Sequence, residues 1–389
     1  MVHPWWTSRR IARTENGASL FEHFAVVTDP RVEYLADHKL MDILVIAICA
    51  VICGADDWTE VELFGKARQA WLGQFLELKN GIPSHDTFGR VFARLDAQQF
   101  QESFASWVQA VFQATGGQVV AIDGKTARRA HERARGKEAI HLVSAWATAN
   151  HLVVGQRQVD GKSNEITAIP QLLRLLDVHG CIVTIDAIGC QTAIAAQIID
   201  QGADYLLTVK ANQPHLLEDM SLFFRLAQAN NFQKVDHTYH RTVNKGHGRL
   251  EVRECWAISG EESLHFLREA AAWKQLRSIA MITNRRQIGA QTTSETRYYI
   301  SSLANDAQRI LEGARSHWAI ENQVHWVLDV SMAEDHSRVR QGNGQANLAL
   351  LRRIALNLLK QETTLKRGIK AKRLKAALST DYLLQVLHP

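Results

Sequence analysis

The stretch AIDGKTARRA, residues 121–130, ends an apolar run with the carboxylate of Asp123 and places three cations close behind it. Those cations are Lys125, Arg128 and Arg129. An Asp-Gly pair is also typical of an ordinary turn, because Asp bonds its own backbone and Gly tolerates positive φ. The β-branched and apolar residues before the acid predict a buried strand. The stretch therefore predicts a strand that ends in a carboxylate beside a cationic patch.

A second stretch, CIVTIDA at 181–187, places Asp186 in the same way at the end of a buried apolar run. If both strands lie in one sheet, Asp123 and Asp186 emerge at an edge where ligands commonly bind in open α/β sheets. A third acid, Glu321, falls in the middle of an apolar stripe on a helix predicted over 306–328, so its side chain is expected to face inward. An inward-facing carboxylate requires a cation, a metal or a raised pKa, and a structural salt bridge is the simpler alternative.

Three acids from two strand ends and a helix suit divalent cations, which prefer hard oxygen ligands. We therefore expect Asp123, Asp186 and Glu321 to hold Mg²⁺, with Mn²⁺ as a substitute. Two such ions about 4 Å apart can activate a water or a DNA 3′-hydroxyl for in-line phosphoryl displacement. The three cations after Asp123 would then contact the phosphate backbone.

Composition indicates a globular protein, because 389 residues with 46% hydrophobic content can bury a large core. The most apolar run, 43–55, is shorter than the roughly 20 residues needed to span a bilayer and predicts a core helix instead. Five cysteines without metal-site spacing indicate free thiols, and no signal peptide is visible, so a cytoplasmic protein without membrane contact is expected.

Charge is uneven along the chain. The net charge is +5, yet residues 352–389 carry nine Lys or Arg against two acids, a local charge of +7. Such a tail can contact a polyanion by counterion release, although a solvated helix end explains a lone charge run equally well.

The pattern of apolar residues divides the chain into five parts. The predicted fold class is α/β, a mixed sheet flanked by helices, with strands and helices in the order β-β-β-α-β-α-β from about residue 116. The expected parts are a helical N-terminal domain, the first part of a core, a strand-rich insertion, the second part of the core and a basic tail, at 1–115, 116–231, 232–303, 304–365 and 366–389.

Together these residues resemble the DDE insertion-sequence transposases with an RNase H-like core, in the branch that includes the H-repeat-associated proteins found beside Rhs elements. The stretches that carry the resemblance include AIDGKTARRA, KSNEITAIPQLL, VTIDAIGCQ, DYLLTVKANQ and HWAIENQVHWVLDVSMAEDHSRVR. The resemblance implies that Asp123, Asp186 and Glu321 are the catalytic and metal-binding triad. It also implies binding to the terminal inverted repeats of an element, double-stranded DNA as partner, and a homodimer on paired ends. By the same resemblance, the helical N-terminal domain would recognise DNA ends, the two core parts would form the catalytic core, and the protein would be associated with the bacterial nucleoid.

One departure concerns the catalytic helix. Better-studied relatives carry a Tyr, an Arg and a Lys around the Glu, where this chain has Ala314, His317 and Leu328. Three further acids, Asp329, Glu334 and Asp335, are rivals for the metal. Tryptophans on this helix could stack on an unpaired base, but such residues lie in a core more often. The expected DNA contacts, besides the cations after Asp123, are Lys162, Lys210, Asn212, Arg315, His317, Trp318, Asn322, His325, Arg338 and Arg340.

Two other functions remain open from the sequence. A catalytically inactive DNA-binding relic or regulator of an element would keep the fold without the reaction. A phosphatase-like hydrolase with Asp123 as nucleophile is weak, because Lys125 stands where such enzymes have a second Asp.

Overall fold

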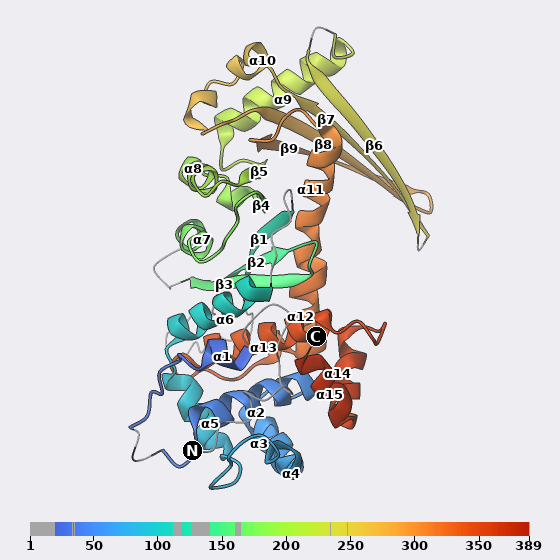
Figure 1. The fold of residues 1–389 in the computed structure, drawn as a ribbon. Helices are drawn as coiled ribbons and strands as arrows, with labels where there is room; N and C mark the ends of the chain where they lie inside the picture. Colours follow the sequence, from blue (N-terminus) through green and yellow to red (C-terminus); the bar gives the residue numbers. More distant parts are fainter. Residues whose placement is uncertain are drawn as a thin grey trace.

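A computed structural model describes most of the chain, namely residues 20–32, 34, 36–111, 118–126, 141–159, 165–233, 235–246 and 248–388. Figure 1 shows a helical layer at one end, a sheet with flanking helices in the middle, and long strands projecting at the other end. The expected mixed sheet flanked by helices is confirmed. Across the described residues, every helix is too short or too polar to span a membrane.

The helical layer combines the two ends of the chain. Helix α2 is buried on nearly all sides, which explains why the run 43–55 is apolar without periodicity. It packs against α13, so the N-terminal helices share a core with the end of the chain. The N-terminal helices are α1 (Leu20–Phe24), α2 (Leu40–Cys53), α3 (Trp58–Ala67), α4 (Gln69–Leu72), α5 (His85–Arg94) and α6 (Ala97–Val111).

The middle of the molecule has the predicted order of strands and helices. Strands β1, β4 and β5 are parallel, and β2 and β3 continue the sheet antiparallel from β1. The elements are β1 (Val119–Thr126), β2 (His141–Ala147), β3 (Leu152–Val159), α7 (Glu165–Leu173), β4 (Ile182–Ile185), α8 (Thr192–Asp200), β5 (Asp204–Val209) and α9 (Pro214–Ala229).

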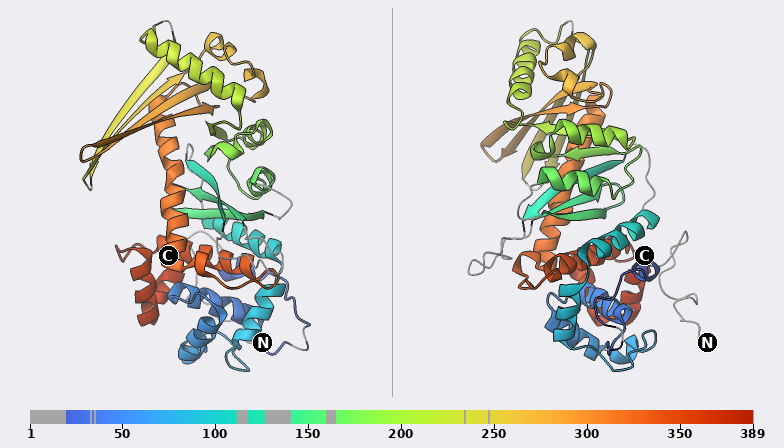
Figure 2. Two further views of the ribbon diagram at one scale, coloured as in Figure 1. Left: turned by 180° about the vertical axis from the view of Figure 1, so that it is seen from behind. Right: turned by 90° about the vertical axis from the view of Figure 1, so that its left-hand side faces the viewer.

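The strand-rich segment extends this same sheet. Strand β9 pairs antiparallel with β5, Leu206 opposite Ser301, and the nine strands lie in the order β3-β2-β1-β4-β5-β9-β8-β7-β6. The outer ends of these long strands project from the molecule as a curved arm (Figure 2). The elements are β6 (His237–Gly246), β7 (Arg249–Ile258), α10 (Glu261–His265), β8 (Ser278–Ile288) and β9 (Gln291–Ser301).

A long helix connects the strand arm to the helical layer. Figure 2 shows α11 crossing the sheet, and it packs against β1, β4, β6 and β7. The helix predicted over 306–328 is in fact three pieces, because a π turn separates α11 from α12. The elements are α11 (Ala307–Ile320), the π turn (Glu321–His325), α12 (Trp326–Met332), a 3-10 turn (Glu334–His336), α13 (Gly344–Gln361), α14 (Ile369–Leu378) and α15 (Thr380–Leu387).

The basic C-terminal segment is folded, and four of its nine cations are buried. Lys372 donates to the carbonyl oxygen of Leu359 at 2.8 Å, and Arg373 donates to that of Val51 at 3.1 Å. These side chains hold helices together, so the full +7 is not available to a polyanion, contrary to expectation. The four buried cations are Arg352, Arg353, Lys372 and Arg373.

Candidate active site

Asp123 and Asp186 lie at the ends of neighbouring parallel strands. The register pairs Ile122 of β1 with Ile185 of β4, one residue before each acid. Both carboxylates therefore emerge at the same edge of the sheet, as the two apolar runs predicted. Strand β1 continues beyond its acid, where Asp123 pairs with Ser144 of β2.

The carboxylate of Asp186 is held by its own turn. Its Oδ1 accepts the backbone N–H of Ile188 at 2.9 Å and caps the 3-10 turn Ala187–Gly189. The side-chain amide of Asn212 donates to the carbonyl oxygen of Ala187 at 2.5 Å. Asn212, predicted as a DNA contact, therefore supports the turn beside the second acid, and Lys210 is exposed just after β5.

Glu321 begins the π turn, in which Trp326 donates its backbone N–H to the Glu321 carbonyl oxygen. The apolar stripe is buried as predicted, but the Glu321 side chain is 65% exposed. The inward orientation expected for Glu321 is thus wrong. The helix passes an open groove at this point, and Glu321 lines that groove instead of the core.

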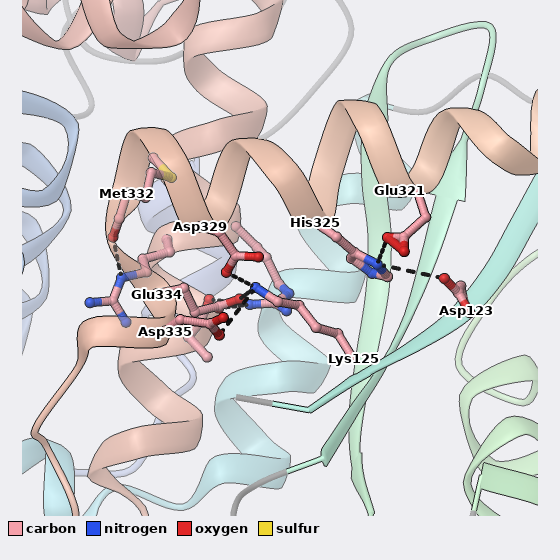
Figure 3. A network of polar contacts seen from close by, with 11 residues as sticks. Asp123, Lys125, Glu321, His325, Asp329, Met332, Glu334 and Asp335 are labelled. Carbon is pink, nitrogen blue, oxygen red and sulfur yellow. Dashed lines mark hydrogen bonds and ion pairs between the residues drawn. The ribbon is translucent and has the colours of Figure 1, made fainter. Parts of the chain in front are cut away.

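His325 joins Glu321 to Asp123 (Figure 3). Its Nδ1 lies 3.0 Å from Oε2 of Glu321 and 3.5 Å from Oδ2 of Asp123, and the His325 side chain is 6% exposed. Potential ligand atoms of these three residues all lie within 4.8 Å of one another, whereas Asp186 is outside this group. Sequence reasoning assigned His325 to DNA and missed this bridge, although the Glu-to-His spacing of four residues is the signal of a helical pair.

Burial and the neighbouring acids oppose the ionisation of Asp123. Burial raises the pKa of Asp123 to about 7. The charges of Asp186, Glu321 and Glu165 act in the same direction, while the N–H of Gly124 opposes them. A divalent cation relieves such a concentration of carboxylates, and carboxylate oxygens are the donors that Mg²⁺ and Mn²⁺ prefer. The donor set therefore fits the expected metal.

Lys125 lies in an ion cluster beneath the helix instead of facing solvent. Its ammonium pairs with Asp329, with Oε2 of Glu334 at 2.9 Å, and with Oδ1 of Asp335 at 3.8 Å (Figure 3). The three rival acids are thus partners of a lysine. The geometry does not favour the phosphate contact expected of Lys125, because its side chain is 10% exposed and its donors face carboxylates.

Glu334 links this cluster to α13. Its Oε1 accepts from Arg353 at 2.7 Å, and both side chains are buried. Burial alone would raise the pKa of Glu334, but Arg353, Lys125 and Arg352 together lower the pKa to about 2. Arg352 donates in turn to the carbonyl oxygen of Met332 at 3.1 Å (Figure 3).

A groove of about 1100 Å³ runs from Glu321 and His325 toward the strand arm. Trp318 and Trp326 are 47% and 58% exposed, contrary to the usual burial of tryptophan. The guanidinium of Arg297 lies 3.9 Å over the Trp318 ring. Of the expected DNA contacts, Arg315, Trp318, Asn322 and His325 line this groove. The arginines that strands β7, β8 and β9 add to the lining are Arg249, Arg253, Arg286 and Arg297.

The remaining predicted contacts are scattered. His317 faces Thr184, with Nδ1 and Oγ1 3.2 Å apart, and burial lowers its pKa to about 4, so the ring is neutral near pH 7. Arg338 is exposed and Arg340 is partly buried in the segment before α13. Three predicted contacts lie outside the described residues, namely Arg128, Arg129 and Lys162.

Comparison with known proteins finds two matching families and several relatives. The family described as "Transposase DDE domain" matches residues 114–358, and "DDE_Tnp_1-associated" matches residues 21–108. The chain is 41% identical over 372 residues to "Putative transposase YncI" of Escherichia coli O157:H7, covering 95% of this chain and 94% of the relative. It is 40% identical over 373 residues to "H repeat-associated putative transposase YhhI" of Escherichia coli strain K12, covering 95% and 97%. "Inactive transposase YbfQ" of that strain is 44% identical over 75 residues, covering 19% and 89%.

Proposed function

Because this chain belongs to the DDE transposase family, we propose that it binds the terminal inverted repeats of an insertion element, cleaves DNA there and transfers the strand to a target. The observation that carries this proposal is the register of β1 and β4, which brings Asp123 and Asp186 to one sheet edge, together with the link from Asp123 through His325 to Glu321. We assign the central sheet to the RNase H-like class on the same grounds.

The three acids would hold Mg²⁺, for which Mn²⁺ would substitute. When bound, two such ions stabilise the attacking and leaving oxygens of an in-line phosphoryl displacement. Glu321 is the most exposed of the three and opens onto the groove, so a phosphate backbone can approach it. His325 orients Glu321 and Asp123, and the Ile188 N–H fixes the carboxylate of Asp186.

DNA would reach the acids along the groove. Arg315 and the strand arginines supply positive charge, and the exposed ring of Trp318 offers a stacking surface for a base. The helical N-terminal domain would recognise the element ends, and two copies of the chain would act on paired ends. A protein that handles chromosomal DNA in this way works in the bacterial cytoplasm, at the nucleoid.

Cleavage of DNA carrying the inverted repeats, with Mg²⁺ or Mn²⁺, tests the proposal directly. Asp123→Asn, Asp186→Asn and Glu321→Gln should each abolish nicking at the repeat ends, because each removes a charged metal-holding oxygen. Glu312→Gln is the matched control, since Glu312 is an exposed acid on α11 away from the groove lining. Full cleavage by any one of the three site variants would defeat the assignment of that acid.

The alternative is a catalytically inactive DNA-binding relic of an element. One short relative is named an inactive transposase, and this name is consistent with the alternative. The same assay separates the two functions. Binding to the repeats without metal-dependent nicks would favour the relic.

A further inference from the structure

Strand β1 contacts the helix formed by α11, the π turn and α12 at two points. The distance between the two points along the strand is similar to the distance along the helix. Asp123 meets His325, and Lys125 meets Asp329. Residues two apart on a strand lie on one face about 6.6 Å apart, and residues four apart on a helix lie on one face about 6 Å apart. The two contacts therefore form a pair that docks the helix along the strand, one contact inside the proposed metal site and one next to it.

We propose that Lys125 is a positioning residue, whose ion pairs with Asp329 and Glu334 fix the π turn bearing Glu321 against the strand bearing Asp123. This inference rests on the proposed function, because it concerns the spacing of the acids that would hold the metal. Lys125 touches neither Glu321 nor Asp123 in any of its ion pairs and acts through the helix that follows the π turn.

The carboxylate of Glu334 shows why Lys125 can fix a position. Its two oxygens are held from opposite elements, Oε2 by Lys125 of β1 at 2.9 Å and Oε1 by Arg353 of α13 at 2.7 Å. The side chains of Glu334 and Arg353 are 3% and 0% exposed. Ion pairs in such surroundings are screened little, and losing one partner leaves a buried charge uncompensated. The strand is thereby tied to the helical layer immediately behind Asp123.

We assign this positioning role to Lys125 in place of the phosphate contact that the sequence predicted. An ammonium has three donors. Two of them are used by Asp329 and Glu334, and Asp335 lies 3.8 Å away. The remaining donor lies in a side chain that is only 10% exposed, so a phosphate would have to compete with these acids for Lys125. Metal-free DNA affinity should therefore be unchanged in Lys125→Met, whereas removal of a phosphate-binding lysine would lower the salt dependence of binding by about one unit.

The test is Mn²⁺ binding to the full chain without DNA, followed through the magnetic resonance signal of free Mn²⁺. Lys125→Met should weaken binding by about 10- to 100-fold, the range found when residues that orient metal ligands are removed. Lys372→Met is the matched control, because Lys372 is also buried, with 8% of its side chain exposed, and pairs with Glu362 far from the acids. The control should lose stability but retain the parent affinity.

Cleavage supplies a second readout. The Mn²⁺ concentration for half-maximal cleavage should rise in Lys125→Met by the same factor as the dissociation constant, and saturating Mn²⁺ should restore the rate. If Lys125→Met does not fold, Asp329→Asn takes its place, since Asp329 is 31% exposed and its loss keeps the pair with Glu334. That variant should weaken Mn²⁺ binding by about tenfold.

The outcomes separate this inference from the proposed function. Parent affinity in Lys125→Met, or in Asp329→Asn where that variant is used, would overturn the positioning role and leave the transposase intact. Equal weakening by Lys125→Met and Lys372→Met would also overturn it, because general destabilisation then explains both. A parent protein that binds no Mn²⁺ would overturn the metal site and the positioning role together.

Discussion

At the scale of single residues, the raised pKa of Asp123 gives the metal-free protein a defined pH dependence. Burial, aided by the neighbouring acids, raises the pKa of this carboxyl from 3.8 to about 7. Between these values the unfolded chain is ionised at this position while the folded chain keeps the proton. The folded state then binds more protons, so the free energy of unfolding falls as pH rises from about 4 to 7, and the cost remains above pH 7.

Asp123→Asn should remove this dependence. Without metal, the variant should exceed the parent in unfolding free energy by on the order of 4 kcal/mol at pH 8 and nearly match it at pH 4. Urea denaturation at several pH values measures the difference. Excess Mn²⁺ should stabilise the parent alone, because the variant lacks the charged ligand. A constant difference between the two proteins at all pH values would contradict the origin given for the shift.

The sequence predicted the structural positions of some of these residues but not of others. Asp123 and Asp186 were predictable, because each follows an apolar run and strand ends are local features. Lys125 was predicted as a DNA contact, and its ion-pair partners were not predicted, since they lie 204 and 209 residues away and no local pattern reports them. The exposure of Glu321 was missed for a related reason, because a periodic stripe shows which face is apolar but not where that face leaves the core.

At the scale of elements, the π turn decides how Glu321 and His325 face one another. A π turn bonds i to i+5 and contains one residue more than an α-helical turn, and such turns are frequent at functional sites. Deleting Asn322, which is exposed, should let the helix continue as α-helix with its buried stripes in place on both sides. Glu321 and His325 would then be three residues apart, still neighbours on the helix but at a different angle from the one that now places Nδ1 of His325 3.0 Å from Oε2 of Glu321.

We expect this deletion to retain the fold, by circular dichroism, and to weaken Mn²⁺ binding at least about tenfold. Asn322→Ala keeps the number of residues in the turn and should bind Mn²⁺ like the parent. Retained affinity in the deletion would mean that the π turn is not needed for the site. The sequence could not show this turn, because apolar residues recur at spacings of three and four positions on both sides of it.

At the scale of the whole molecule, the sequence predicted a mixed sheet but not its extent. The order of strands and helices from β1 to β5 followed from periodicity. That β6 to β9 extend the same sheet depends on one antiparallel pairing, Leu206 opposite Ser301, between segments far apart in the chain. Such a pairing is set by long-range packing, which a pattern of single residues does not encode. The groove, which is lined by the outer strands and α11, was unpredictable for the same reason.

The basic C-terminal segment divides into cations that hold the fold and cations that face solvent. Lys375 is exposed, but its ammonium lies 4.2 Å from the centre of the Tyr382 ring. Lys366, Arg367 and Lys370 are the other exposed cations, whereas Lys372 and Arg373 are buried and donate to carbonyl oxygens of other helices. Only the exposed group can release counterions from DNA. Replacing all three with Ala should therefore reduce the salt dependence of DNA binding. Each phosphate that a cation no longer neutralises removes about 0.9 from the slope of log affinity against log salt.

If all three bind phosphates, the slope should fall by about 2.7 with no change in unfolding free energy. Arg373→Ala supplies the contrast, because it removes a buried cation whose pair with Asp56 and bonds to carbonyl oxygens join the two ends of the chain. That variant should lose stability and, where folded, keep the parent slope. Fluorescence anisotropy with a DNA duplex at several salt concentrations measures the slopes. An unchanged slope in the triple variant would mean that these three cations neutralise no phosphates, and it would favour the groove arginines as the source of nonspecific binding.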